Sequence, residues 1–154
     1  MELKVYNNLT RSKELFNTQT PKKVKFYSCG PTTYDFLHVG NARALIVGDL
    51  FYRVLITLGY EVIFVRNFTD VDDKIIDTAK KRGVDPLVYA EKYVQECLKD
   101  MKELNMLPPT YSPKVSETIP EIIEMISDII KNNAAYVING EVLYHVPSKA
   151  DYGK

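Results

Sequence analysis

The residues best suited to chemistry lie in one stretch of the chain, between Cys29 and Asn41. In this stretch, His38 is followed after one residue by Gly40 and Asn41. Imidazole can donate a hydrogen bond to a phosphate oxygen, glycine lets a flat base or ribose approach the backbone, and a helix N-terminus adds free N–H groups. This combination predicts a nucleotide site. A plain strand-to-helix turn, with Asn41 as the N-cap, accounts for the same residues.

Thiol and carboxylate groups offer two further kinds of chemistry. Cys29 could ligate a metal, but a small buried hydrophobic residue is the commoner role of a free cysteine. Cys97 falls inside a predicted helix, so we expect it in the core. Asp70, Asp72 and Asp73 could bind magnesium or act as acids and bases, yet an acidic first turn of a helix also explains them. We therefore assign these three carboxylates no catalytic role.

The stretch Cys29–Asn41 needs a strand before it and a helix after it, and the flanking sequence predicts both. Residues 24–28 are β-branched and aromatic, which is typical of a buried strand. The apolar pattern of residues 42–58 predicts a helix that ends at Gly59, and residues 62–65 predict a second buried strand. The order strand, helix, strand predicts an α/β fold with a parallel sheet, whose ligands bind at the carboxyl ends of the strands.

Further helices are expected in the middle of the chain. One covers residues 72–82, which are acidic at the start and basic at the end, and the next covers residues 86–104, which open on a proline. The pattern then breaks at two adjacent prolines. We therefore place a domain boundary after residue 112, so that residues 1–112 form the first domain and residues 113–154 the second.

The second domain is expected to contain a helix followed by a β-hairpin. Thr118 and Glu121 form a T-x-x-E pattern, which predicts a capping box at the start of an isoleucine-rich helix. Asn139 and Gly140 separate two apolar runs, and this pair predicts a hairpin with a type I′ turn. His145, near the end of the second run, is expected to face outward.

Composition and charge argue against several classes of protein. The 154 residues include 20 basic and 20 acidic side chains, so the net charge of zero argues against a broadly basic nucleic-acid binder. No uncharged apolar run approaches the ~18 residues of a membrane helix, and no signal peptide is visible. The two cysteines do not make a disulfide scaffold. We expect a cytoplasmic protein with no membrane partner.

Several motifs of the chain resemble those of one enzyme family. The run His38-Val39-Gly40-Asn41 is similar to the HIGH signature of class I aminoacyl-tRNA synthetases, with an asparagine in place of the last histidine. The motifs within residues 5–10, 29–32, 65–74 and 136–153 resemble those of the cysteinyl-tRNA synthetases in particular. The resemblance runs through essentially the whole chain, in order and without large gaps.

The resemblance implies a HUP-type, Rossmann-like fold with a parallel sheet. This chain would hold the first half of that fold and then the start of an inserted α+β segment with a helix and a β-hairpin. In the same family, Gly30 and Thr69 would adjoin the substrate cysteine, and Cys29 would be a zinc ligand. His38 and Asn41 would be the catalytic residues. The ATP-binding residues that the resemblance implies are Pro31, Thr32, Tyr34, His38, Gly40 and Asn41.

The implied reaction is ATP-dependent activation of cysteine to cysteinyl-adenylate and its transfer to tRNA(Cys), with ATP and magnesium as substrate and zinc as cofactor. The family's other zinc ligands and its KMSKS loop have no match in the 154 residues. We therefore expect this chain alone to be inactive and to bind zinc weakly or not at all. The protein is also expected to be a monomer. Two alternatives stay open, a cysteine-activating ligase of the mycothiol-synthesis type and a non-catalytic nucleotide-binding module.

Overall fold

The computed structural model describes residues 2–153 of the chain. The chain forms two compact units, Met1–Val115 and Ser116–Lys154, and each is described by itself. The first unit is a mixed α/β structure with a parallel strand pair, and it contains the Cys29–Asn41 stretch. The second is a helix followed by an antiparallel hairpin.

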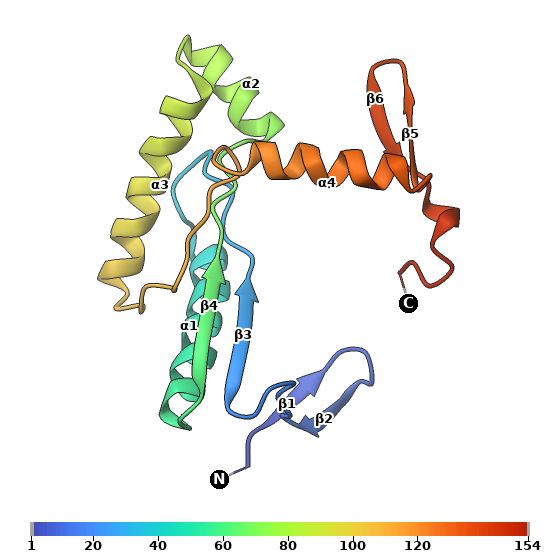
Figure 1. Ribbon diagram of the computed structural model, residues 1–154. Helices are drawn as coiled ribbons and strands as arrows, with labels where there is room; N and C mark the ends of the chain where they lie inside the picture. The colour runs from blue at the N-terminus through green and yellow to red at the C-terminus, as the bar shows by residue number, and fades with distance from the viewer. Residues whose placement is uncertain (1, 154) are drawn as a thin grey trace. The chain divides into compact units, whose positions relative to one another are not determined.

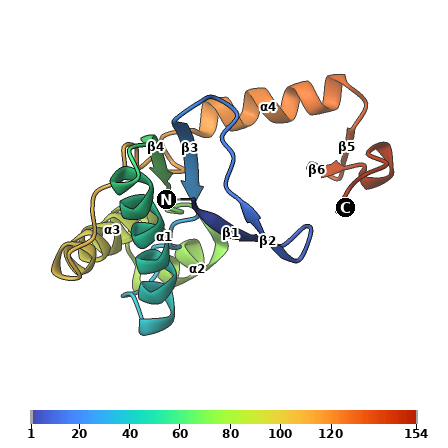
Figure 2. The same cartoon turned by 90° about the horizontal axis from the view of Figure 1, so that it is seen from below.

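A parallel pair of strands with a connecting helix forms the centre of the first unit, as predicted (Figure 1). Strands β3 (Lys23–Ser28) and β4 (Glu61–Arg66) pair in parallel, with Lys23 opposite Glu61 and Ser28 opposite Arg66. Helix α1 (Val39–Thr57) links them and lies against one face of the pair in both views (Figures 1 and 2). The α/β fold is therefore confirmed in its strand–helix–strand core.

Aromatic rings fill the space between this sheet face and α1. The ring of Phe26 lies stacked on that of Phe64, with centroids 4.8 Å apart, and meets the edge of Phe51 at 5.2 Å. The ring of Tyr52 lies 4.9 Å from that of Phe64, and Leu55 of the same helix is fully buried. Along β3 the more buried Val24 and Phe26 alternate with the exposed Lys23, Lys25 and Tyr27, so this strand has one face toward α1 and one exposed face.

A third segment extends the parallel pair on the far side of β4, and the sequence did not predict it. Residues 110–115 form parallel bridges to β4 and the residues after it, Tyr111 with Val65 and Lys114 with Phe68. The backbone N–H of Arg66 donates to the carbonyl oxygen of Tyr111 at 3.0 Å. The chain therefore runs along β4 before it reaches the second unit.

Helices α2 (Asp73–Arg82) and α3 (Pro86–Glu103) follow β4 at nearly the predicted bounds. Asp72 caps α2, since its side chain accepts a hydrogen bond from Lys74 N–H at 2.9 Å, and this confirms the acidic helix start. Gly83 ends α2 in the left-handed conformation with φ of 67°. The two helices pack through a buried cluster made of Ile75, Ala79, Tyr89, Ala90 and Tyr93.

An N-terminal hairpin precedes the parallel pair, and it was also missing from the sequence prediction. Strand β1 (Lys4–Asn7) pairs antiparallel with β2 (Ser12–Leu15). The four residues of β2 are Ser, Lys, Glu and Leu, and three of them are exposed, so no alternation of buried and exposed apolar residues marks this strand. The side chain of Asn7 donates to Glu14 across the pair at 3.0 Å.

The second unit contains α4 (Ile119–Lys131), β5 (Ala135–Ile138), β6 (Glu141–Tyr144) and a short 3-10 turn (Val146–Ser148). Asn139 and Gly140 have φ of 52° and 83°, the two positive values that a type I′ turn requires, so the predicted hairpin is confirmed. The capping box is wrong, because the Thr118 side chain makes no capping hydrogen bond to α4. His145 is exposed, as expected.

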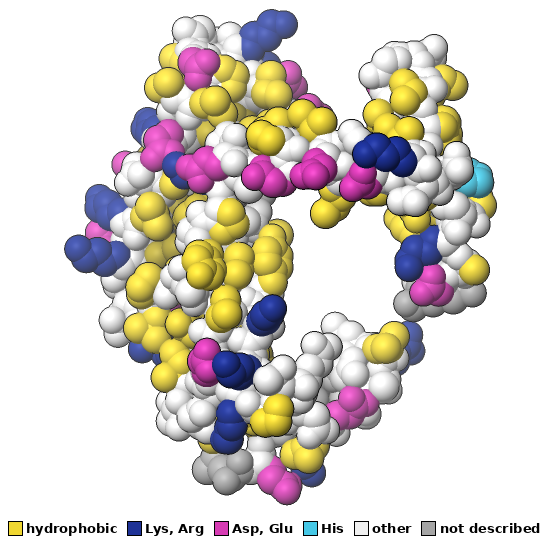
Figure 3. All heavy atoms as spheres, viewed as in Figure 1, with side chains coloured by type: hydrophobic (Ala, Val, Ile, Leu, Met, Phe, Trp, Pro, Cys, Tyr) yellow, Lys and Arg dark blue, Asp and Glu magenta, His cyan; other side chains and the backbone are white. Residues whose placement is uncertain are grey.

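Helix α4 carries hydrophobic and acidic side chains along its surface (Figure 3). The structure describes every residue of this helix and none of them is buried. Its exposed apolar residues are Ile119, Ile122, Ile123, Met125 and Ile126. Within the described part of the chain, no helix combines the length and apolar character needed to cross a membrane.

Candidate functional site

The site lies where the loops after β3 and β4 meet at the carboxyl ends of the parallel strands (Figure 1). The first loop covers residues 29–38 and leads into α1, and the second covers residues 67–72 and leads into α2. The N-terminus of α1 is at the same edge, because the helix runs back along the strands. Ligands of open α/β sheets bind at this edge, and a helix N-terminus there favours phosphate.

Backbone hydrogen bonds hold the two loops together as a continuation of the sheet. Thr69 N–H donates to Pro31 O at 3.1 Å, and Thr33 N–H donates to Thr69 O at 3.0 Å. These bonds form a parallel bridge between Thr32 and Thr69. The hydroxyl of Thr33, which is 2% exposed, donates to the same carbonyl at 3.3 Å. These hydrogen bonds join the backbones of the two loops at the sheet edge.

Gly30 contacts the backbone of Asn67 so closely that no side chain fits. A Cβ on Gly30 would lie 1.6 Å from the carbonyl oxygen of Asn67. The Gly30 N–H donates to Oδ1 of Asn67 at 2.9 Å, and Nδ2 of Asn67 donates to Oγ1 of Thr69 at 3.3 Å. The structure thus connects Gly30 with Thr69, the two residues predicted to adjoin the substrate cysteine, through a side chain to which the sequence assigned no role.

His38, and not Asn41, is the N-cap of α1, so the alternative of a plain turn capped by Asn41 is wrong. The helix begins at Val39, three residues before the predicted start, and Asn41 is the third residue of the helix. The ring nitrogen Nδ1 of His38 accepts from Gly40 N–H at 3.0 Å, while Oδ1 of Asn41 accepts from His38 N–H at 3.5 Å. These two bonds form a capping box, with a histidine and an asparagine in the places that Ser or Thr and Glu usually take.

The capping box determines which polar atoms of His38 and Asn41 remain for a ligand. Since Nδ1 of His38 accepts a hydrogen bond, the proton of the neutral ring is on Nε2. Since Oδ1 of Asn41 also accepts, its Nδ2 keeps both of its donors. A glycine at position 40 lets the His38 ring lie over the first turn of α1, because a Cβ on Gly40 would lie 2.8 Å from Cε1 of His38. Both side chains are exposed, so two sets of N–H donors are free at the N-terminus of α1.

The remaining predicted site residues lie along the same loop. Pro31 and Thr32 are half-buried in the bridge to the second loop, and Tyr34 is 38% exposed. The carbonyl oxygen of Tyr34 accepts from the hydroxyl of Tyr89 on α3 at 2.9 Å, which ties the loop to the helical part of the unit. Its ring lies 5.3 Å from the ammonium of Lys74. An exposed aromatic ring beside a lysine can stack on a base.

The described residues do not by themselves fit a zinc ion. Cys29 is exposed, and its Sγ lies 3.6 Å from the carbonyl oxygen of Gly30. Between residues 2 and 153, no group of three or more His, Cys, Asp or Glu side chains is arranged to hold a metal. A structural zinc site needs four protein ligands and a catalytic site three. No step of the chemistry below is therefore derived through zinc.

The two cysteines should differ sharply in reactivity. Burial raises the pKa of Cys97 to about 12, and the neighbouring Asp100 adds to the shift. At pH 8 only about 10⁻⁴ of this thiol is then in the reactive thiolate form, whereas Cys29 is exposed. We expect a disulfide reagent such as DTNB to modify one thiol of the native chain within minutes and the second only in denaturant. Cys29→Ser should abolish the fast phase, and two equally fast thiols in the native protein would contradict this assignment.

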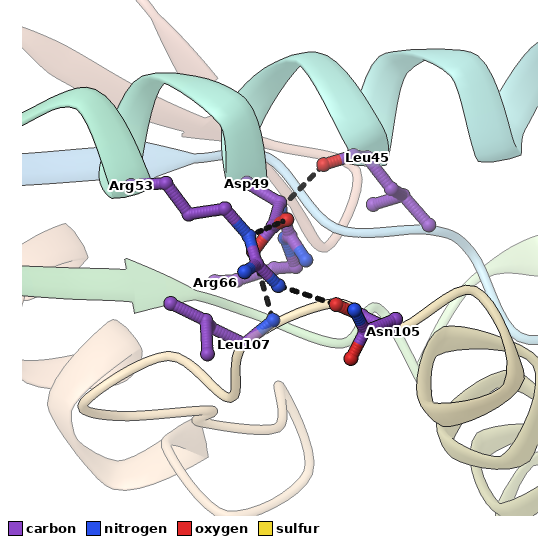
Figure 4. A network of polar contacts seen from close by, with 6 residues as sticks. All are labelled: Leu45, Asp49, Arg53, Arg66, Asn105 and Leu107. Atoms are coloured by element: carbon purple, nitrogen blue, oxygen red, sulfur yellow. Dashed lines mark hydrogen bonds and ion pairs between the residues drawn. The ribbon is translucent and has the colours of Figure 1, made fainter.

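A buried polar network supports the base of the site (Figure 4). Arg66, the last residue of β4, is 1% exposed and donates from Nη2 to the carbonyl oxygen of Leu45 in α1 at 3.0 Å. Burial lowers the pKa of Arg66, and the charge of Asp49 opposes this shift. The sequence assigned Arg66 no buried role. Its position directly before Asn67 means that the network holds the strand end from which the second loop begins.

Asp49 connects α1 to the segment that follows α3 (Figure 4). Its Oδ2 accepts from Nε of Arg53 at 2.7 Å, and its Oδ1 accepts from Leu107 N–H at 2.8 Å. Arg53 in turn donates to the carbonyl oxygen of Asn105. Asp49 is 7% exposed, so these contacts compensate for the loss of water around a buried carboxylate.

Comparisons with known proteins give one consistent result. The family model for tRNA synthetases class I (C) catalytic domain matches residues 15–154. The chain is 51% identical over 154 residues to "Cysteine--tRNA ligase 2, cytoplasmic" of Arabidopsis thaliana, covering 100% of this chain and 30% of that protein. Against the cysteine–tRNA ligase of Archaeoglobus fulgidus it is 51% identical over 153 residues, or 99% of this chain and 33% of the relative.

The chain therefore spans about a third of the length of the curated relatives that it matches. A solved structure, the ternary complex of the Agrobacterium radiobacter K84 LeuRS with tRNA and LeuAMS, is similar in fold, with a TM-score of 0.65. It is 21% identical in sequence and covers 77% of this chain and 16% of that one.

Proposed function

The chain belongs to the family of class I tRNA synthetase (C) catalytic domains, and from this premise we propose that the protein containing it activates cysteine with ATP and transfers it to tRNA(Cys). The observation that carries the proposal is the meeting of the loops after β3 and β4 at one sheet edge, joined by the bridge between Thr32 and Thr69. In this proposal, one loop and the α1 N-terminus serve ATP, and the contact between the loops serves cysteine.

ATP binding is proposed for the first loop and the start of α1. The Nε2–H of His38, the Nδ2 donors of Asn41 and the first N–H groups of the helix would donate hydrogen bonds to the phosphates and stabilise their negative charge. Gly40 allows the nucleotide to approach the backbone. The same loop contains Pro31, Thr32 and Tyr34, which are also proposed to bind ATP. The exposed ring of Tyr34 offers a surface for the base.

Cysteine binding is proposed for the contact between Gly30 and Thr69. The substrate ammonium would donate to the Thr69 hydroxyl, and its carboxylate would face the α-phosphate. In the reaction, a carboxylate oxygen forms a bond to the α-phosphorus and the bond from that phosphorus to the bridging oxygen of pyrophosphate breaks. The products are cysteinyl-adenylate and pyrophosphate. The residues described here contribute orientation and charge stabilisation.

Other parts of the proposal concern the complete protein. Cys29 would be one zinc ligand, with the others supplied from outside the residues described here. ATP would bind with magnesium. The protein would be a cytoplasmic monomer without a membrane partner, and the 154 residues by themselves would not aminoacylate tRNA.

His38→Asn tests the proposal with little disturbance of the fold. Asparagine is a strong N-cap and keeps an acceptor for Gly40 N–H, but it lacks the Nε2–H donor. We expect kcat of cysteine-dependent ATP–pyrophosphate exchange in the complete gene product to fall by about 10²-fold, the usual effect of removing one such donor. His145→Asn, a change at an exposed histidine of the second unit, should keep kcat within about twofold. Wild-type kcat in the His38→Asn variant would contradict the proposal.

A further inference from the structure

Asn67 joins the two residues proposed to adjoin the substrate cysteine. Its Oδ1 accepts two hydrogen bonds, from Gly30 N–H and from the hydroxyl of Tyr27, each at 2.9 Å. Its Nδ2 donates to Oγ1 of Thr69 at 3.3 Å. The side chain therefore connects the end of β3, the first loop and the second loop. Neither the sequence motifs nor the proposed mechanism gives it a role.

The hydrogen bonds leave Asn67 only one orientation of its amide. A backbone N–H can only donate, so the oxygen of the amide must face Gly30 and the nitrogen must face Thr69. The Thr69 hydroxyl consequently accepts from Asn67 with one of its two lone pairs. One lone pair and the hydroxyl proton of Thr69 remain for a ligand. An ammonium group, which can only donate, would use that lone pair.

The same residue also sets the position of the Gly30 backbone. The Asn67 carbonyl oxygen occupies the space of a Cβ on Gly30, while the Asn67 side chain holds the Gly30 N–H. Main chain and side chain of Asn67 thus both contact the Gly30 backbone, next to the backbone bonds of Thr69 that join the two loops. His38 and Asn41 are held by their own capping box at the start of α1, without a contact to Asn67 among the hydrogen bonds found in residues 2–153.

We infer that Asn67 is a positioning residue for the amino-acid substrate, acting through Gly30 and Thr69 and not through the ATP-binding residues. This inference rests on the proposed function. It requires that loss of the Asn67 side chain weakens binding of cysteine and leaves binding of ATP unchanged. A purely structural role at the strand end would disturb both loops and would raise both KM values together.

Steady-state ATP–pyrophosphate exchange in the complete gene product tests the inference. In Asn67→Ala we expect the KM for cysteine to rise about tenfold, while kcat and the KM for ATP change by less than about twofold. Asn67→Ser is the second variant, since its hydroxyl is too short to bridge Gly30 and Thr69 but remains hydrated, which favours folding. In this variant too, the KM for cysteine should rise while the KM for ATP changes by less than about twofold.

Tyr27→Phe is the matched control. The Tyr27 hydroxyl is exposed and contacts the same Oδ1, so water can replace it and the bond to Gly30 keeps the amide in place. We expect its KM for cysteine to stay within about twofold of the wild type. A folded Asn67→Ser variant with an unchanged KM for cysteine, or with an equal rise in the KM for ATP, would overturn the inference alone. A wild-type protein without cysteine-dependent exchange would overturn the proposed function and the inference with it.

Discussion

Replacing Gly30 by alanine is expected to lower kcat/KM for cysteine-dependent exchange by at least ~10²-fold, because a displacement of about 1 Å in a reacting geometry has an effect of this size. The added Cβ would lie 1.6 Å from the Asn67 carbonyl oxygen, which is backbone and not a flexible side chain. The two loops must separate by more than an ångström to relieve this overlap. We also expect the free energy of unfolding to fall by about 1–3 kcal/mol, as for other overpacked sites.

Gly59→Ala is the control for this prediction. Gly59 follows α1 with φ of 76°, and a Cβ there would meet no atom within 4 Å. Alanine at this position should therefore lower the free energy of unfolding only by the strain of a positive φ, about 1 kcal/mol. The exchange activity should stay within about twofold of the wild type. Activity is measured in the complete gene product and unfolding in the 154-residue chain. If Gly30→Ala were as active as Gly59→Ala, the close contact of the two loops would not matter for the reaction.

Asp49→Ala is expected to lower the free energy of unfolding of the 154-residue chain by about 3–5 kcal/mol, because it leaves the buried guanidinium of Arg66 without the nearby negative charge of Asp49. The substitution removes the acceptor of Leu107 N–H and the partner of Arg53. It also removes the carboxylate whose negative charge opposes the lowering of the Arg66 pKa by burial. Urea denaturation gives the value, with the slope m unchanged if the unfolded state is not affected.

Two further variants make the Asp49 prediction specific. Asp49→Asn keeps an acceptor for Leu107 N–H and should cost less, about 1–3 kcal/mol, so it remains measurable if the alanine variant does not fold. Glu61→Ala removes an ion pair with Lys23 in which both side chains are more than half exposed. Its effect should not exceed about 1 kcal/mol. An Asp49→Ala variant as stable as Glu61→Ala would contradict a structural role for the network.

The elements that the sequence predicts well are those with strong local signals. Each of these signals determines the structure within a few residues of its own position. Examples are the apolar run of β4, the proline that opens α3 and the glycine that ends α2. Asp72 caps α2 for the same reason, since a carboxylate before a helix accepts from its first N–H groups. Such signals predicted the α/β fold and the helix bounds to within three residues.

The start of α1 was misjudged because two candidate caps compete there. Asparagine is a common N-cap and histidine is not, so the plain-turn alternative places the cap at Asn41. The structure uses both residues, His38 as the cap and Asn41 as its reciprocal partner. In the sequence only Gly40 indicates this arrangement, because it leaves room for the imidazole over the first turn of the helix.

Contacts between residues far apart in the chain could not be predicted. Gly30 and Asn67 are separated by 37 positions, and the glycine is required by a carbonyl oxygen that no local pattern reveals. Arg66 ends an apolar strand, where a charged residue predicts the surface, but it is 1% exposed under α1. Gly48 leaves room for its guanidinium, since a Cβ there would lie 3.0 Å from Nη2. The extended conformation of residues 110–115 likewise depends on pairing with β4 and the residues after it, and no local pattern predicts that pairing.

In the proposed function, this chain supplies the nucleotide and amino-acid contacts of a cysteine-activating site. The measurement that tests it most directly is ATP–pyrophosphate exchange in the complete gene product, with cysteine, serine and leucine each offered as the amino acid. We expect exchange that depends on cysteine, and only background exchange with serine and leucine. A folded protein that shows no cysteine-dependent exchange, or that exchanges equally with leucine, would contradict the claim.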